Sequence, residues 1–268
     1  MINIMQKFKR FLFWLSIVLS LPLCWGGTSV LIWPIDPVLE DYQNATAVWL
    51  ENKGDSAGYF QIRTFKWHQE NNEDIFDTQN EIIASPPFAL IEPDKKQLIR
   101  LVRDASGKVP EGGEKAYRVF VDEIPYTPET SAQEEGKPKK VSAGLQLQMR
   151  YSIPLFSNGK NVWTKEDHQN KRDPKTMSRP QLHYQILNKN GQWWISIHNS
   201  GAVHARLSRL VLDKSGSEET LLEGLIGYVL PGSTMSWAIP KQYNINSQSK
   251  FKAKVNDDIE LISLIPQR

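Results

Sequence analysis

The fold is indicated most clearly by one alternating stretch, Leu145-Gln146-Leu147-Gln148-Met149-Arg150-Tyr151-Ser152-Ile153-Pro154-Leu155. Its odd positions are all apolar or aromatic, and its even positions are all polar or proline. This period of two predicts a β-strand, because successive side chains of a strand point to opposite faces. At about 3.3 Å per residue the apolar row covers roughly 30 Å, whereas an ordinary strand has about five or six residues. The row either completes the core of its own domain or extends past that core to a partner.

Other short alternating segments lie on both sides of this strand, and no long segment shows the 3.6-residue period of a helix. We therefore expect an all-β chain with an N-terminal sandwich domain at 27–156, a charged linker at 157–179 and a smaller β domain at 180–268. The polar stretch 127–140 and the linker flank the long strand, which favours its placement at the edge of a sheet. The expected strands are Ser29–Glu40, Ala45–Asn52, Gly58–Trp67, Lys96–Val102, Ala116–Ile124 and Gly144–Phe156, then Leu182–Leu187, Trp193–Asn199, Ala205–Leu212, Thr220–Val229, Thr234–Ile239 and Glu260–Ile265.

The N-terminus has the pattern of a secretory signal peptide. Lys7, Lys9 and Arg10 precede the apolar run Phe11–Cys24, and small glycines follow at 26 and 27. The run is shorter than the roughly 20 apolar residues that span a membrane, so we expect a signal peptide at 1–26 and a periplasmic protein, with an uncleaved anchor as the alternative. Cleavage removes the single cysteine. The mature chain then has no disulfide, thiol nucleophile or cysteine-based zinc site.

Charge and motifs argue against several other classes of protein. Without the signal peptide the chain has 29 basic and 30 acidic residues, so no nucleic-acid partner is expected. His198 and His204 flank a turn, but no acid lies close in sequence to complete a metal site. We find no nucleophile elbow, phosphate-binding loop or dinucleotide fingerprint. The residues therefore predict no enzymatic activity, no small-molecule substrate, no metal and no cofactor.

The order of the motifs resembles the PapD-like periplasmic chaperones of the chaperone–usher pilus pathway, and most closely their divergent archaic-type branch. The resemblance covers essentially the whole mature chain. Its matching stretches are Ala47–Asn52, Ala84–Pro87, Ile91–Pro93, Gln97–Leu101, Val119–Pro125, Leu145–Phe156 and, in the second domain, Gly227–Ser233.

This resemblance implies two immunoglobulin-like β-sandwich domains set at an angle, and binding of pilus subunits that lack one strand. The chaperones of this family lend their own strand to such a subunit by donor-strand complementation, which is a form of β-augmentation. The resemblance also implies delivery of the subunit to an outer-membrane usher, and the free protein could cap its donor strand by forming a dimer. The candidate subunit-binding residues are Leu145, Leu147, Met149, Tyr151 and Ile153.

One departure from the family concerns the anchor for the subunit's C-terminal carboxylate. Typical members carry basic residues at two positions that correspond here to Pro37 and Pro154. A proline side chain cannot bind a carboxylate, whereas arginine pairs with one through two hydrogen bonds. The candidate substitutes are Arg150, Arg100 and Arg103, with Arg118 as a fourth.

Two functions outside this family stay open at the level of the sequence. The nine tryptophans suit a secreted carbohydrate-binding or adhesin module as well as two sandwich cores. An exported hydrolase with an unrecognised site is the third possibility. The long alternating strand before the linker favours the chaperone.

Overall fold

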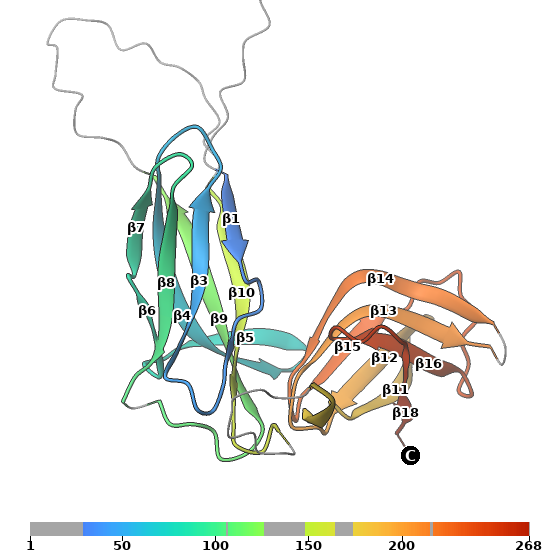
Figure 1. Ribbon diagram of the computed structural model, residues 1–268. Coiled ribbons are helices and arrows are strands. Elements are labelled where there is room, and N and C mark those ends of the chain that lie inside the picture. The colour runs from blue at the N-terminus through green and yellow to red at the C-terminus, as the bar shows by residue number, and fades with distance from the viewer. Residues whose placement is uncertain (1–28, 106, 126–147, 164–173, 215–216, 268) are drawn as a thin grey trace, which may run out of the picture.

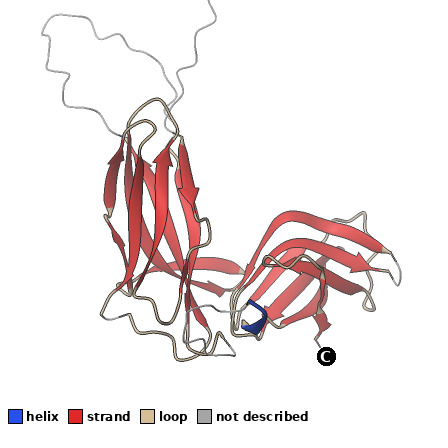
Figure 2. Cartoon of the chain, in the orientation of Figure 1, coloured by secondary structure: helices blue, strands red, loops and turns tan. Residues whose placement is uncertain are grey.

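Strands dominate the computed structural model of the chain, which describes residues 29–105, 107–125, 148–163, 174–214 and 217–267. The helical element in these ranges is η1, a single 3₁₀ turn at Pro174–Thr176 (Figure 2). Within the same ranges, no helix has the length and apolar character needed to cross a membrane.

The first domain is a sandwich of two sheets, and hydrophobic side chains from both sheets fill the space between them. One sheet has the order β1-β3-β8-β6, and the other has the order β2-β10-β9-β4-β5, with β7 beside β4. Alternation along each strand produces this core, because Val48 and Leu50 of one sheet meet Phe60 and Ile62 of the other. The strands are β1 (Val30–Trp33), β2 (Val38–Leu39), β3 (Ala45–Asn52), β4 (Gly58–Glu70), β5 (Glu73–Thr78), β6 (Ile82–Ser85), β7 (Phe88–Ile91), β8 (Lys96–Arg103), β9 (Glu114–Ile124) and β10 (Arg150–Asn158).

The second domain repeats the architecture with two four-stranded sheets, β15-β12-β11-β18 and β14-β13-β16-β17. Its first hairpin turns at Asn190 and Gly191, which both have positive φ, as a two-residue hairpin requires. Ile195, Ile197 and Phe251 are buried in its core. The strands are β11 (Leu182–Lys189), β12 (Gln192–Asn199), β13 (Ala205–Asp213), β14 (Glu218–Val229), β15 (Thr234–Ala238), β16 (Lys250–Val255), β17 (Ile262–Ser263) and β18 (Ile265–Pro266).

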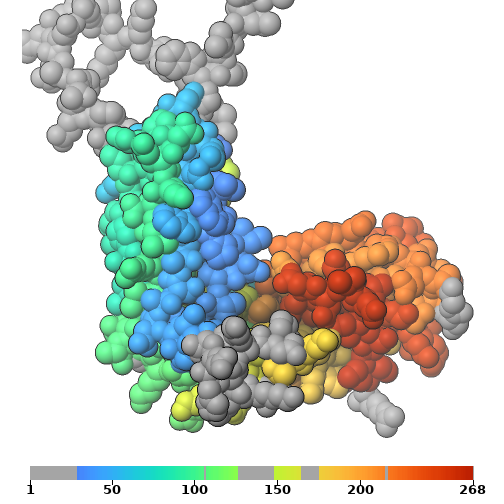
Figure 3. Space-filling view, viewed as in Figure 1, coloured from blue at the N-terminus to red at the C-terminus, as the bar shows by residue number. Residues whose placement is uncertain are grey.

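The two domains lie at an angle and meet at one end of the first sandwich. In Figure 1 the long strands of the first domain stand upright, and the second domain extends sideways from their lower end. The β4–β5 hairpin reaches from the first domain toward the second (Figure 1). The space-filling view shows the same corner between the two bodies (Figure 3). The expectation of two immunoglobulin-like sandwiches set at an angle is therefore confirmed.

Several strand boundaries differ from those expected. The single strand expected at Ser29–Glu40 is divided into β1 and β2, which belong to different sheets. Pro34 and Pro37 lie between them and cannot donate to a ladder, which explains the break. Ser157 and Asn158, expected to begin the linker, are instead the buried last residues of β10 and pair with β9.

Four strands were not anticipated: β5, β6, β7 and β16. Half of the residues of β5 are acidic and most are exposed, while β6 and β7 have four residues each, so the apolar alternation in them is weak or short. β16 has the sequence Lys-Phe-Lys-Ala-Lys-Val, so the signal for a strand with one buried face is present there.

Candidate functional site

Strand β10 has a partner along the whole of one edge but only at the end of the other. It pairs antiparallel with β9 from Arg150 to Asn158. On its second edge β2 pairs with Phe156 and Ser157 alone. Within the described part of the chain, residues 150–155 therefore have no strand on that side. An open edge of this kind can accept another strand through main-chain hydrogen bonds.

The residues predicted to bind a partner are arranged in three ways. Ile153 is 5% exposed and belongs to the core of the first domain, and Tyr151 packs against that core. Met149 precedes the strand and is 46% exposed. Leu145 and Leu147 lie outside the described residues. The predicted row thus passes from an exposed side chain at Met149 into the protein's own core at Ile153, and its role toward a partner stays a prediction.

Arg150 is held on the outer face of the sheet that contains β10. Its side chain forms an ion pair with Asp122, the residue opposite it on β9. Arg63 binds the same carboxylate, with 2.5 Å between Nη2 and Oδ2. Burial alone would raise the pKa of Asp122, but the hydrogen bonds from the two arginines hold it below its usual value. Arg150 is therefore already paired with an acid of its own domain, which it shares with Arg63.

Arg100 and Arg103 lie on β8, in the other sheet. Arg100 is exposed and pairs in register with Ala47 and Ser85. The Nη2 atom of Arg103 donates to Oγ of Ser157 over 2.9 Å, and burial lowers the pKa of the guanidinium. Neither side chain belongs to the face that carries Arg150.

Arg118 occupies the remaining position of interest, directly opposite Pro154 in the β9–β10 ladder. Its guanidinium carbon lies 3.8 Å from the ring centroid of Trp67 and 5.2 Å from that of Tyr228, which belongs to the second domain. Its Nε atom is buried without a hydrogen-bond partner. Burial lowers the pKa of this group. The structure thus places an incompletely satisfied cation at the corner between the domains.

Pro37 takes part in the backbone hydrogen bonding of β10. Its carbonyl oxygen accepts a hydrogen bond from the backbone nitrogen of Phe156, with an N···O distance of 3.3 Å. At Pro154 the missing backbone donor coincides with the edge that β2 does not cover. Both prolines therefore shape the edge of the strand.

The corner itself is built by side chains that are far apart in the sequence. Gln69, on the β4–β5 hairpin, donates to the carbonyl of Tyr228 and accepts from the backbone nitrogen of Leu230, each over 2.9 Å. Asn72 makes the same two-way contact with the backbone of Ser236. A small apolar cluster fills the space behind them and consists of Trp67, Ala116, Phe156, Leu230 and Tyr228.

Sequence reasoning missed these corner residues. An isolated Gln, Asn or Tyr on a strand carries no pattern that distinguishes a domain contact from a solvated face. The signal that was available is Trp67, an aromatic residue on the side of β4 opposite the core residues Phe60 and Ile62.

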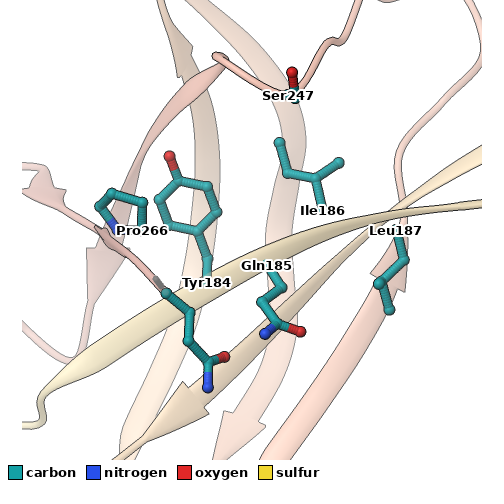
Figure 4. Close-up of a pocket in the computed structure, with 7 residues that line it drawn as sticks. Tyr184, Gln185, Ile186, Leu187, Ser247 and Pro266 are labelled. Carbon is teal, nitrogen blue, oxygen red and sulfur yellow. The ribbon is translucent and has the colours of Figure 1, made fainter.

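Other kinds of site find little support in the described residues. No group of three or more histidine, acidic or cysteine side chains there is arranged to hold a metal ion. A depression of about 230 Å³ lies on the second domain and is lined by Tyr184, Gln185, Ile186, Leu187, Ser247, Pro266 and Gln267 (Figure 4). This lining contains no carboxylate, imidazole or amine, and its phenol, that of Tyr184, donates to the carbonyl of Ser249.

Comparisons with known proteins agree with the geometry. A family profile described as the pili and flagellar-assembly chaperone PapD N-terminal domain matches residues 37–162. The chaperone CsuC, solved in a pre-assembly complex with the tip adhesion subunit of archaic chaperone–usher Csu pili of Acinetobacter baumannii, is 35% identical, with 90% of this chain and 100% of that chain covered and a TM-score of 0.67.

More distant structures share the fold. The CupB2 chaperone of Pseudomonas aeruginosa is 14% identical, with coverage of 87% of this chain and 100% of that one and a TM-score of 0.55. The Escherichia coli chaperone DraB is 16% identical, with coverage of 88% and 97% and a TM-score of 0.55. No curated protein sequence matches the chain. The identity and coverage shared with CsuC, together with the two angled sandwiches and the open-edged β10, show that the chain belongs to the PapD-like family of pilus-assembly chaperones, in its archaic branch.

Proposed function

We propose that this protein captures pilus subunits by lending them strand β10, and that it passes them to an outer-membrane usher. The open edge of β10 at residues 150–155 carries the proposal. A subunit strand laid along this edge would gain main-chain hydrogen bonds, while alternate side chains of the donor segment would fill its groove. The relative CsuC has been solved with a tip adhesion subunit, which supports a partner of this class.

The subunit-binding row in this proposal is Leu145, Leu147, Met149, Tyr151 and Ile153. The exposure of Met149 supports its place in the row, because a side chain that is open in the free protein can transfer to a groove. Ile153 is already buried in the chaperone. We therefore expect the contribution to binding to be largest at Met149 and in the residues before it, and smallest at Ile153.

Arg118 is the best-supported anchor for the subunit's C-terminal carboxylate. Arg150 is exposed and already paired with Asp122, and Arg100 and Arg103 lie in the other sheet. Arg118 stands opposite Pro154 and has a buried Nε with no partner. An incoming carboxylate would satisfy that nitrogen through a charge-assisted hydrogen bond worth about 1.5–3 kcal/mol. Arg118 would thus replace, across the ladder, the cation that Pro154 cannot provide.

The anchor is tested by measuring the affinity of Arg118→Gln for a subunit with a free and with an amidated C-terminus. The loss for the free carboxylate should be at least about tenfold, and amidation should abolish the difference between variant and wild type. Arg100→Gln is the matched control and should bind as wild type. Equal loss for both forms of the subunit would contradict a carboxylate anchor at Arg118.

Export completes the proposal. The family is periplasmic, and residues 1–26 would act as the cleaved signal peptide, so N-terminal sequencing of the exported protein should start near Gly27. The mature protein would act without cofactor or enzymatic activity, and a dimer would cap the free donor strand. A membrane-bound product that retains Met1 would overturn the export mechanism.

The decisive experiment for the function is periplasmic co-expression with the pilus subunits encoded by neighbouring genes. The tagged chaperone should co-purify with a subunit that aggregates or is degraded when expressed alone. Met149→Asp should reduce the recovered subunit and leave the β-sheet circular dichroism spectrum unchanged. If the wild-type protein recovers no subunit while remaining folded, the proposed function is wrong.

A further inference from the structure

A buried carboxylate, that of Glu114 at the start of β9, makes a further contact between the domains. It accepts hydrogen bonds from the backbone nitrogen of His204 over 2.6 Å and from its Nδ1 over 2.9 Å. The backbone nitrogen of Glu114 donates to the carbonyl of Ala202 over 3.0 Å. The Glu114 side chain is only 1% exposed. A buried carboxylate is tolerated only when it is hydrogen-bonded, so the 202–204 segment of the second domain is what satisfies it.

Close approach of the two backbones depends on Gly113. This residue has a φ of +66°, and a Cβ atom built on it would lie 2.8 Å from the carbonyl oxygen of Ala202. Both facts disfavour any other residue at this position. The contact between β9 and the 202–204 segment therefore leaves no room for a side chain at position 113.

The ring of His204 also contacts β10. It stacks on the ring of Phe156 with 3.5 Å between centroids and 4° between planes. Phe156 is buried and lies opposite Ala116 in the ladder. One imidazole from the second domain therefore touches both β9, through the carboxylate, and β10, through its ring face.

The second domain fixes the position of His204 independently. Asn256 donates from Nδ2 to the carbonyl of His204 over 3.2 Å, and its Oδ1 accepts from the backbone nitrogen of Arg206 over 2.7 Å. An ionised carboxylate only accepts hydrogen bonds, so the contact with Glu114 selects the tautomer of His204 in which Nδ1 carries the proton. The imidazole therefore lies between the domains with its Nδ1–H group directed at the Glu114 carboxylate.

We propose that His204 is a positioning residue that couples docking of the second domain to the order of β10. Phe156 and Ser157 of β10 pair with β2 on one side and β9 on the other, whereas residues 150–155 pair with β9 alone. The contact of His204 with Phe156 therefore restrains β10 next to the point where its open edge begins. Register matters at this place, because a slip of one residue turns every side chain to the opposite face. This inference rests on the proposed function and extends it: the second domain, which does not contain the donor strand, controls how ordered that strand is.

The experiment measures amide hydrogen exchange in the free full-length protein, so it does not depend on any subunit. His204→Ala should raise exchange of the β10 amides that bond to β9 by at least about tenfold, as expected for the loss of a charge-assisted hydrogen bond. Exchange in β3 should stay at the wild-type rate. His198→Ala is the matched control, because His198 contacts Thr234 within the second domain.

Two conservative variants separate the bond from the stack. His204→Asn places an amide donor near the position of Nδ1 and should recover part of the protection, while His204→Phe keeps the stack on Phe156 and loses the bond to Glu114. In wild-type protein the ¹⁵N spectrum of His204 should show a protonated Nδ1, and Glu114→Gln should shift that signal.

Unchanged exchange in β10 for both His204→Ala and Glu114→Gln would overturn the proposal. Loss of protection in β3 and β10 together, in every variant, would also overturn it, because the effect would then be global unfolding. A wild-type protein with the expected exchange pattern that captures no subunit would instead contradict the proposed function and leave the coupling intact.

Discussion

Replacing Ile153 and Met149 separately by alanine distinguishes the part of the β10 row that builds the chaperone from the part that is available to a subunit. Ile153 is 5% exposed within the first core, so its truncation removes buried methyl groups and leaves a cavity. Such changes cost about 2–5 kcal/mol of unfolding free energy. Met149 is 46% exposed, and substitutions at surface positions usually stay within about 0.5 kcal/mol.

Urea unfolding followed by tryptophan fluorescence measures both effects. Because the two domains can unfold separately, Ile195→Ala in the second core serves as the matched control that assigns each transition. We expect Ile153→Ala to shift the first-domain transition by about 3 kcal/mol and Met149→Ala to leave it in place. Subunit recovery should fall for Met149→Asp at unchanged stability.

The reverse result would refute this reasoning. If Ile153→Ala costs less than about 1 kcal/mol and abolishes subunit capture, Ile153 must leave its own core to enter the subunit. A large loss of stability in Met149→Ala would show that Met149 is a core residue despite its exposure.

Gly113→Ala should loosen the contact between the domains, because Gly113 has a positive φ and the carbonyl oxygen of Ala202 lies close to the added Cβ. Spin labels on the two domains should report a broader distance distribution for this variant. The control Gly112→Ala should match wild type, since no atom lies closer than 3.8 Å to its added Cβ. Burial would raise the pKa of Glu81, but hydrogen bonds from Lys115 and Tyr117 lower it overall. The ionised Glu81 therefore stabilises the fold fully above the ordinary carboxyl pKa, and this stabilisation is lost as the pH falls through the lowered pKa. In urea titrations at a series of pH values, Glu81→Gln should flatten this acid dependence, whereas the exposed control Glu111→Gln should leave it unchanged. Asn199→Ala should destabilise the second domain by at least about 3 kcal/mol, because this buried amide forms hydrogen bonds with four backbone groups and each buried group left unpaired costs about 1–3 kcal/mol. A loss of stability below about 1 kcal/mol by calorimetry would mean that water replaces the amide.

Local patterns along the chain were sufficient to predict the all-β class, the two-domain order and several strands with their bounds. β3 begins at Ala45 and ends at Asn52 as the alternation predicts, and the motif order identified the family. These features are readable because alternation is local: the side of a strand on which a residue lies depends only on its neighbours in the chain. The same rule aligned Met149, Tyr151 and Ile153 in one row.

The burial of that row and the identity of the cation in the corner depend on how the strands and domains pack in three dimensions. Ile153 is covered because the opposite sheet reaches that far along β10, and Arg118 stands opposite Pro154 because of the ladder register. The bond between Glu114 and His204 joins residues 90 positions apart in the chain. Such contacts depend on register and on domain docking, which no local pattern encodes, because they arise only when separately folded surfaces meet.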